Sequence, residues 1–432
     1  MRSIQSTHNL VAVSANNKET AINTEQTLDT GILAARASIP DFAPRIENNA
    51  DEAIGKEEPD TVYNLGSNFS FAMNFDKAQC QHVAFIAAYA LGVHSKGAAG
   101  ATGWKHTIGP IDGDLDAARS NPSFTLAYRL GKRLITERQA SCFVDSFTLS
   151  LVKDAWMKLT AQIKGTGKRT TNNIPETVSG FYDSASLTLA ANAVSGTDAP
   201  TRLDNVHHVR CQVPTTLEWV DVVVSEVSAA VPAVLTIVPP GGAHTACDFK
   251  IIYNAKEDGS YAWATFPNRI AEPPLRPTDF SVNFGGKWNG STILGGHTVQ
   301  ADINSLEWIF NNNLTPDHTA GAGSTDYCNR GLRSGRVQTV KFDRMMREAI
   351  LRQWMASQTT FVLYAKAEYP VEYEAGHKYT VEIVFPKVGI MTAPVKESEK
   401  RLAEDATFQV QQDDTYGSVI LYVKNKVENY GA

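Results

Sequence analysis

Apolar and polar side chains alternate with a period of two along much of this chain, and this constrains its fold more than any other feature. The alternation is clear over residues 124–130 and 157–164, and it returns over residues 361–365, 379–385 and 419–423. Such a pattern is typical of a β-strand with one buried and one exposed face. Because these segments fall in both halves of the chain, the sequence predicts a mainly β protein.

Two segments have the periodicity of a helix instead. The first follows Asp76, a candidate N-cap, and its apolar residues continue to Gly92, a typical helix-ending residue. The second follows Asp343 and places an apolar residue at every fourth position as far as Trp354. We expect each helix to pack one face against a sheet.

The surroundings of these two helices predict an internal duplication. Residues 74–77 (Asn-Phe-Asp-Lys) precede the first helix, and residues 341–344 (Lys-Phe-Asp-Arg) precede the second. Each motif closes a short expected strand, over residues 69–73 and 337–340. The strands that follow are expected at residues 123–130, 143–151 and 155–164 in the first unit, and at residues 360–368, 379–386, 406–411 and 418–425 in the second.

The predicted fold class is therefore mainly β (α+β). It consists of two tandem β-sandwich or barrel units, each with one flanking helix, and a small β insertion between them. The expected domains are an N-terminal arm (1–19), a first unit (20–194), a linker with the small β insertion (195–275) and a second unit (276–432).

Local motifs do not indicate an enzyme or a metal site. The run from Asp112 to Asp116 has the carboxylate spacing of a calcium loop, but Ala117 stands where glycine is needed and Ser123 where a bidentate Glu belongs. His207, His208 and Cys211 have no second ligand cluster. The glycine-rich run 97–103 lacks the Gly-Lys-Ser/Thr end of a phosphate loop. We predict no catalytic residues, no cofactor and no metal.

The charge and composition of the chain indicate which classes of partner it lacks. The chain has 40 Lys and Arg against 46 Asp and Glu, a formal net charge of −6, and no basic block, which argues against a sequence-reading nucleic-acid binder. No apolar stretch has the length of a membrane span, and the N-terminus does not resemble a secretory signal. The 5 cysteines contain no C-x-x-C pair, so we interpret them as reduced and structural.

One polar segment, residues 46–66, is long for a connection between strands and has mixed charge. It is either a loose hairpin or an arm that becomes ordered on a neighbouring subunit. As an arm, it would place the following residues in a contact between subunits: Glu47, Asp51, Glu52, Lys56, Glu57 and Glu58.

The run 48–58 is followed by a strand and by a helix that ends at residues 88–92. A strand pair at 123–128 and 144–151, a strand and asparagine-rich turn at 303–314, and closing strands at 384–388 and 416–425 come later in the chain. Together these segments resemble the tail tube (major tail) proteins of long-tailed bacteriophages. The resemblance covers roughly residues 20–165 and 275–430.

This resemblance implies a structural virion protein that forms stacked rings and so builds a hollow tube for DNA. It implies assembly in the host cytoplasm, a place in the virion tail, and contacts with other copies, the tape measure protein, the tail terminator and baseplate proteins. DNA would pass through the lumen without tight binding, and no membrane would be involved. Segment 46–66 would then join successive rings.

Other interpretations stay open from the residues alone. One is another virion component, such as a baseplate or capsid decoration protein, and another is a carbohydrate-binding or hydrolytic β-sandwich protein. If each chain carries two tube-like units, three chains per ring are favoured. If both halves build one barrel, six are required.

Overall fold

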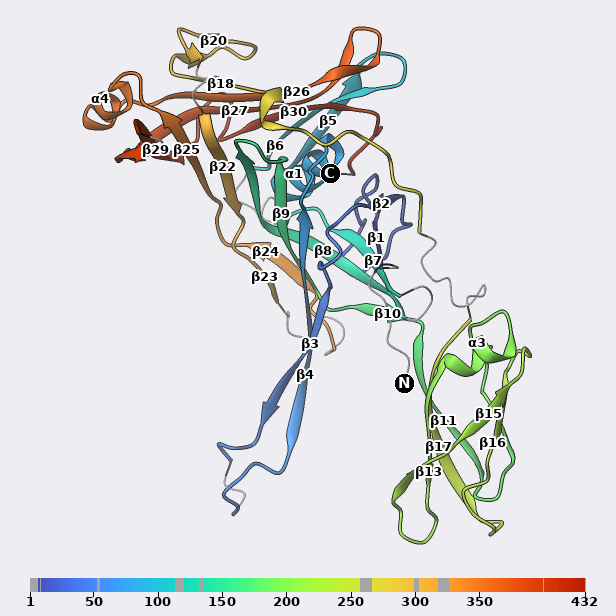
Figure 1. Ribbon diagram of the computed structural model, residues 1–432. Coiled ribbons are helices and arrows are strands. Elements are labelled where there is room, and N and C mark those ends of the chain that lie inside the picture. The colour runs from blue at the N-terminus through green and yellow to red at the C-terminus, as the bar shows by residue number, and fades with distance from the viewer. Residues whose placement is uncertain are drawn as a thin grey trace. The chain divides into compact units, whose positions relative to one another are not determined.

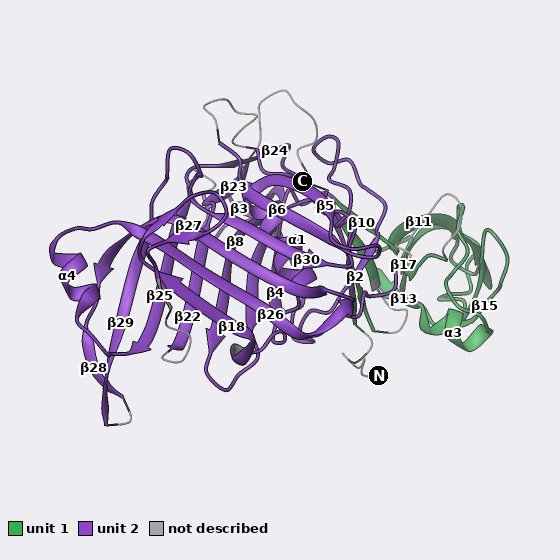
Figure 2. Cartoon of the chain, turned by 90° about the horizontal axis from the view of Figure 1, so that it is seen from above, with its two compact units in different colours: residues 1–10, 127–138, 169–265 green, residues 11–126, 139–168, 266–432 purple. Residues whose placement is uncertain are grey.

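The computed structural model describes residues 7, 9–52, 55–112, 120–131, 135–256, 266–298, 303–317, 326–398 and 400–431. The chain divides into two compact units, coloured separately in Figure 2. Unit 1 contains residues 1–10, 127–138 and 169–265, and unit 2 contains residues 11–126, 139–168 and 266–432. Both units are built mainly from strands, so the predicted mainly β class is confirmed.

Unit 2 is organised around eight antiparallel strands that pair side by side in the order β3–β4–β9–β8–β22–β25–β29–β28. Their bounds are β3 Asp41–Asn48, β4 Val62–Phe75, β8 Ile135–Val152, β9 Lys158–Gly165, β22 Ile303–Asn311, β25 Val337–Met345, β28 Val395–Ser398 and β29 Arg401–Val410. The first four strands, β3–β4–β9–β8, and the last four, β22–β25–β29–β28, are arranged in the same way. A hairpin (β3–β4 or β22–β25) pairs with the second strand of a later hairpin (β9 of β8–β9, or β29 of β28–β29). The pairing of β8 with β22 joins the groups.

A second layer of strands covers one face of this sheet (Figure 1). It runs β5–β6–β30–β27–β26–β18, and the C-terminal part of β27 also pairs with β29. Their bounds are β5 Gly92–Ala98, β6 Trp104–Pro110, β18 Phe280–Phe284, β26 Phe361–Glu374, β27 His377–Thr392 and β30 Ile420–Asn425. Trp308 of β22 lies edge-to-face against Phe385 of β27, with ring centroids 5.3 Å apart, so large aromatic side chains fill the space between the layers.

The remaining strands of unit 2 are short. The first, β1 Leu10–Val13, pairs with β2 Thr30–Ile32. The others are β19 Lys287–Trp288, β20 Ile293–Leu294, β21 His297–Thr298, β23 Leu314–Asp317 and β24 Arg330–Arg333, and a 3-10 turn covers Pro277–Asp279. Strand β7 Phe124–Leu130 begins in unit 2, and its residues 127–130 belong to unit 1.

Both predicted helices exist, but their starts differ from the expectation. Helix α1 (Cys80–Leu91) begins after Gln79 rather than Asp76, and all of its residues are buried. It ends at Gly92, as predicted, where φ is +96°. The second expected helix was wrong at its start, because β25 continues through Asp343 to Met345 and α4 covers only Ile350–Ala356. Backbone pairing with β29 over Asp343–Met345 prevails there over helical periodicity.

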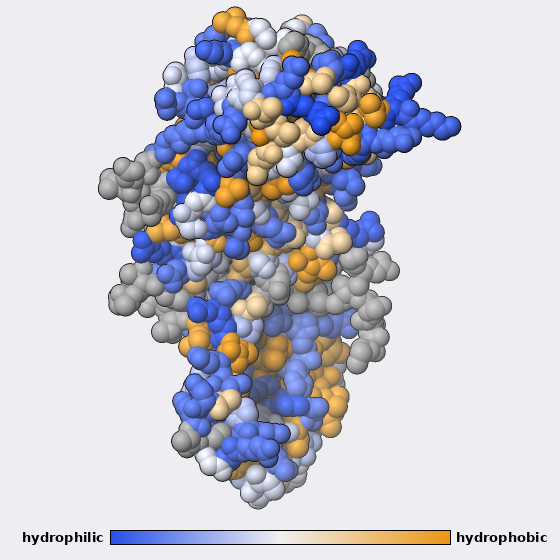
Figure 3. Space-filling model, turned by 90° about the vertical axis from the view of Figure 1, so that its left-hand side faces the viewer, coloured by the Kyte–Doolittle hydropathy of each residue, from blue (hydrophilic) through white to orange (hydrophobic). Residues whose placement is uncertain are grey.

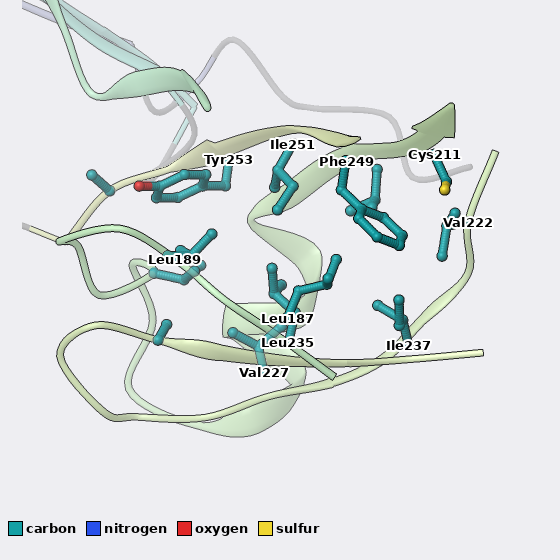
Figure 4. Close-up of a cluster of buried hydrophobic side chains, with 14 residues drawn as sticks. Leu187, Leu189, Cys211, Val222, Val227, Leu235, Ile237, Phe249, Ile251 and Tyr253 are labelled. Carbon is teal, nitrogen blue, oxygen red and sulfur yellow. The ribbon is translucent and has the colours of Figure 1, made fainter. Parts of the chain in front are cut away.

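Unit 1 is a small β-sandwich. One sheet has the order β11–β17–β13–β14 and the other β12–β16–β15. The bounds are β10 Arg169–Thr171, β11 Asn173–Phe181, β12 Ser186–Thr188, β13 Val206–Gln212, β14 Trp219–Asp221, β15 Val224–Val227, β16 Val234–Ile237, β17 Ala246–Asn254 and α3 Ala199–Asp204. Side chains from both sheets, including Leu235 and Phe249, meet in a continuous apolar core (Figure 4).

The boundaries of the two units differ from those of the predicted domains, which were 1–19, 20–194, 195–275 and 276–432. Strand β11 belongs to the small sandwich because it pairs with β17 along its whole length. The expected N-terminal arm contains β1, and Ala12 and Val13 are fully buried. The segments predicted as two separate β units share one sheet through the pairing of β8 with β22. Period-two alternation identifies strands but does not indicate their partners, and this is why the boundaries differ.

A buried ion pair holds β25 and β29 together. Arg344 Nε donates to Glu404 Oε2 at 3.0 Å, and both side chains are almost completely inaccessible to solvent. The same guanidinium reaches Glu348 at 2.9 Å and lies over the ring of Phe284. Removing one member of such a pair leaves an uncompensated buried charge.

We therefore expect Glu404→Gln to lower the free energy of unfolding of unit 2 by about 3 kcal/mol. The matched control is Glu307→Gln, which breaks the partly exposed pair with Lys341 (3.1 Å) and should cost less than about 1 kcal/mol. Urea denaturation of both variants measures the difference. Equal losses would show that Arg344 finds an adequate alternative partner.

Candidate functional site: the β3–β4 hairpin and the polar sheet face

The hairpin formed by β3 and β4 extends beyond the rest of its sheet (Figure 1). Strand β4 pairs with β9 only over Phe69–Phe75, whereas its pairing with β3 reaches Val62. The outer part is therefore a two-stranded ribbon. Gly66 lies where this ribbon meets the sheet, with φ of +101°, and its N–H donates to Asn64 Oδ1 at 2.9 Å. This left-handed conformation favours glycine and turns the ribbon out of the sheet.

The tip of the hairpin is organised by Asn49, which is 3% exposed. Its Oδ1 accepts from the N–H groups of Asp60 and Thr61, each at 3.2 Å, and its Nδ2 donates to Asp60 Oδ1 at 2.8 Å. The Asn49 N–H also donates to the Thr61 carbonyl at 3.3 Å. One side chain thus joins the two strands of the ribbon at the base of the tip, between Asn49 and residues 60 and 61.

All six predicted contact residues lie on this ribbon and its tip, and all are exposed: Glu47, Asp51, Glu52, Lys56, Glu57 and Glu58. Lys56 Nζ lies 2.5 Å from Asp60 Oδ2, and this hydrogen bond lowers the pKa of the Asp60 carboxyl. Tyr63 donates to Glu52 Oε2 at 3.1 Å, which raises the pKa of the Tyr63 hydroxyl. Ala53 and Ile54 lie outside the described residues.

The tip is strongly acidic. From Glu47 to Asp60 the sequence has six acidic residues and one basic residue, so this segment carries a formal charge of −5 out of −6 for the chain. The strands of the ribbon also expose large apolar side chains, among them Ile46 (61% exposed), Val62 (65%) and Leu65 (44%). These exposed apolar residues were not expected, because segment 46–66 is polar over most of its length. The available signal was the presence of these strand-favouring side chains at both ends of the segment.

The eight-stranded sheet of unit 2 has one buried face and one polar face. On strands β8, β9, β25 and β29, mostly apolar residues point into the core, and the alternate positions carry polar side chains, among them Thr148, Ser150, Thr160, Gln162, Thr339 and Thr407. Figure 3 shows one side of the molecule, on which hydrophilic side chains predominate.

Charges on this polar face compensate one another. Lys341 lies 3.1 Å from Glu307 on the adjacent strand. Lys396 lies 2.6 Å from Asp343 and 3.5 Å from Asp405, two carboxylates that stand opposite each other across β25 and β29. The hydrogen bond to Asp343 raises the pKa of Lys396. The face therefore presents hydroxyl and amide groups and several paired charges, together with the exposed Lys158 of β9.

The two edges of this sheet are candidate pairing surfaces. Among the described residues, β3 pairs only with β4, and β28 pairs only with β29. Pro44 lies in β3, a position typical of edge strands, and is followed by a bulge. Open strand edges are templates for pairing with another chain.

The motifs that resembled chemical sites do not come together. His208 contacts Asp221 at 2.9 Å on an exposed face, whereas Cys211 points into the core of unit 1. The glycine-rich run 97–103 connects β5 to β6, and the Glu374 carboxylate accepts from Ala101 and Thr102 N–H groups. Most of the calcium-like loop, residues 113–119, lies outside the described residues. In the described part of the chain, none of the helices has the length and apolar character needed to cross a membrane.

A comparison with protein-family models found none that matches this chain, and a search of curated proteins found no match either. The family resemblance stated above therefore depends on the quoted residues alone.

Proposed function

We propose that this chain is a structural subunit of a bacteriophage tail tube, which forms rings by strand pairing and stacks those rings through the β3–β4 hairpin. It acts in the virion tail after assembly in the host cytoplasm, and it is not an enzyme. Its partners are other copies, the tape measure protein, the tail terminator and baseplate proteins.

The observation that carries this proposal is the eight-stranded sheet of unit 2, with open edges at β3 and β28 and a polar face. Pairing β28 of one chain with β3 of the next satisfies both edges and repeats what β8 and β22 do within one chain. Repeated around an axis, such a contact closes into a ring. The polar face then lines the lumen, and the second layer of strands, β5–β6–β30–β27–β26–β18, lies outside it.

The hairpin supports contact between rings. It is long, its tip is ordered by Asn49, and it combines exposed apolar side chains with acidic ones. An extended ribbon of this kind buries its apolar residues when it lies along a neighbouring subunit. The acidic residues at the tip would add specificity for a basic or hydrogen-bond-donating surface.

Negative-stain microscopy of the purified full-length chain tests the assembly. We expect rods of uniform width with a stain-filled centre, formed on concentration without any added protein. A monodisperse monomer under all assembly conditions, or a closed particle without a channel, would contradict the proposal.

The compensated charges on the sheet face lead to a prediction about DNA. We expect duplex DNA to bind with a Kd weaker than micromolar in about 0.15 M salt, because no cluster of basic residues on the described part of this face is available to release counterions. Fluorescence anisotropy of a labelled duplex measures this affinity. Glu307→Lys, which replaces an ion pair by two lysines on this face, should bind more tightly. Sub-micromolar binding by the unaltered chain, with a steep salt dependence, would show that this view of the lumen is wrong.

A further inference from the structure

Two cysteines in unit 1 lie unusually close together. Cys211 is on β13 and Cys247 is on β17, and their Sγ atoms are 3.1 Å apart. A disulfide bond is about 2.05 Å long, so the two sulfur atoms lie only about 1 Å beyond bonding distance. Both are free thiols in the structure, and they are the only cysteines in the sequence of unit 1.

The positions of these cysteines in the sandwich favour a bond. Strands β13 and β17 are paired, with Cys211 opposite Phe249, and Cys247 lies two residues before Phe249 on the same face of β17. Cys211 is buried beside Val222 and Phe249 in the core (Figure 4), while Cys247 is partly exposed. Cys247 is the second residue of its strand, where a small backbone shift needs little rearrangement.

We infer that Cys211 and Cys247 form a redox-sensitive disulfide that cross-links the two strands when the protein meets an oxidising environment. The partly exposed Cys247 thiolate attacks one sulfur of a small disulfide such as oxidised glutathione and releases one reduced glutathione. Cys211 then attacks the Cys247 sulfur and releases the second. The protein loses two electrons and two protons, and the glutathione disulfide gains them.

The environment of Cys211 determines how fast the disulfide bond is expected to form. Burial, and then contact with Cys247, raises the pKa of the Cys211 thiol to about 12. Because the thiolate is the attacking species, closure should be slow at neutral pH and faster as pH rises toward about 9. Once closed, the bond constrains the chain between residues 211 and 247 in the unfolded state and so stabilises unit 1.

The test uses the full-length chain, incubated with oxidised or reduced glutathione, then denatured and labelled with a maleimide. We expect 5 labelled cysteines after reduction and two fewer after oxidation, with a non-reduced peptide map that joins Cys211 to Cys247. Oxidation should also raise the thermal midpoint of unit 1 by about 10 °C.

Two variants sharpen the test. Cys211→Ser should lose the cross-link and the thermal shift, whereas Cys328→Ser in unit 2 should keep both and serves as the matched control. The peptide map of the unaltered chain shows directly whether Cys211 is joined to Cys247, even where a variant folds poorly. Full labelling after prolonged oxidation at about pH 9, or a cross-link between other cysteines, would overturn the inference.

Discussion

Deletion of residues 50–60 together with Thr61→Gly should abolish tube formation while leaving a folded protein. The register pairs Asn48 with Val62, so the shortened hairpin closes through a two-residue turn in which Asn49 is followed directly by the new glycine. An Asn-Gly pair suits a tight turn between antiparallel strands. The core of unit 2 does not involve this tip, since its described residues other than Asn49 are exposed. We expect no tubes by negative-stain microscopy and an unchanged circular dichroism spectrum.

A second change separates the role of charge from that of length. Glu57→Lys with Glu58→Lys keeps the hairpin intact but reverses two exposed charges, and it should shorten the tubes if the tip meets a basic surface. As a control, residues 213–218 between β13 and β14 in unit 1 can be replaced by Asn-Gly, which should leave tubes unaffected. Tubes of normal length from the deletion variant would refute the stacking role of the hairpin.

The sequence predicted the strands better than their partners. Alternation located β7, β9, β27 and β30 closely, although only β9 and β30 have a single buried face and β7 and most of β27 are buried on both faces. It could not show that β8 pairs with β22, which lies far along the chain, since pairing depends on hydrogen bonds that leave no local pattern. For the same reason the sequence predicts that the small β insertion starts near residue 195, whereas the corresponding segment of unit 1 starts at residue 169.

The candidate site was predicted in part. Charge and length identified the segment around Asp51 and Glu57, and the structure places all six named residues on one ribbon. The sequence did not reveal that β3 and β4 carry exposed apolar side chains beyond the sheet, because alternation alone does not say where a strand leaves its neighbours. It also gave no indication of the contact between Cys211 and Cys247, which depends on the register of β13 against β17.

The number of chains in a ring follows from the eight strands that each chain would supply. Strands about 4.8 Å apart, tilted by about 40°, give a closed barrel whose backbone diameter is about 48 Å for about 24 strands. After side chains of about 5 Å on each side, about 38 Å of lumen remains, enough for a DNA duplex about 20 Å wide. Two chains would leave about 22 Å, which allows no hydration layer, and six would leave about 86 Å, far more than DNA requires.

We therefore predict three chains per ring, arranged so that two non-identical strand contacts alternate around the axis. One contact is the internal pairing of β8 with β22, and the other joins β28 of one chain to β3 of the next. The repeated order of strands in the two halves makes the ring pseudo-sixfold, although its true symmetry is threefold. Cryo-electron microscopy without imposed symmetry measures this directly, and native mass spectrometry of single rings should give the mass of three chains. Glu307→Gln, which lies away from both edges, should leave the number unchanged, whereas six identical chains around the axis would show that the two halves are not equivalent tube units.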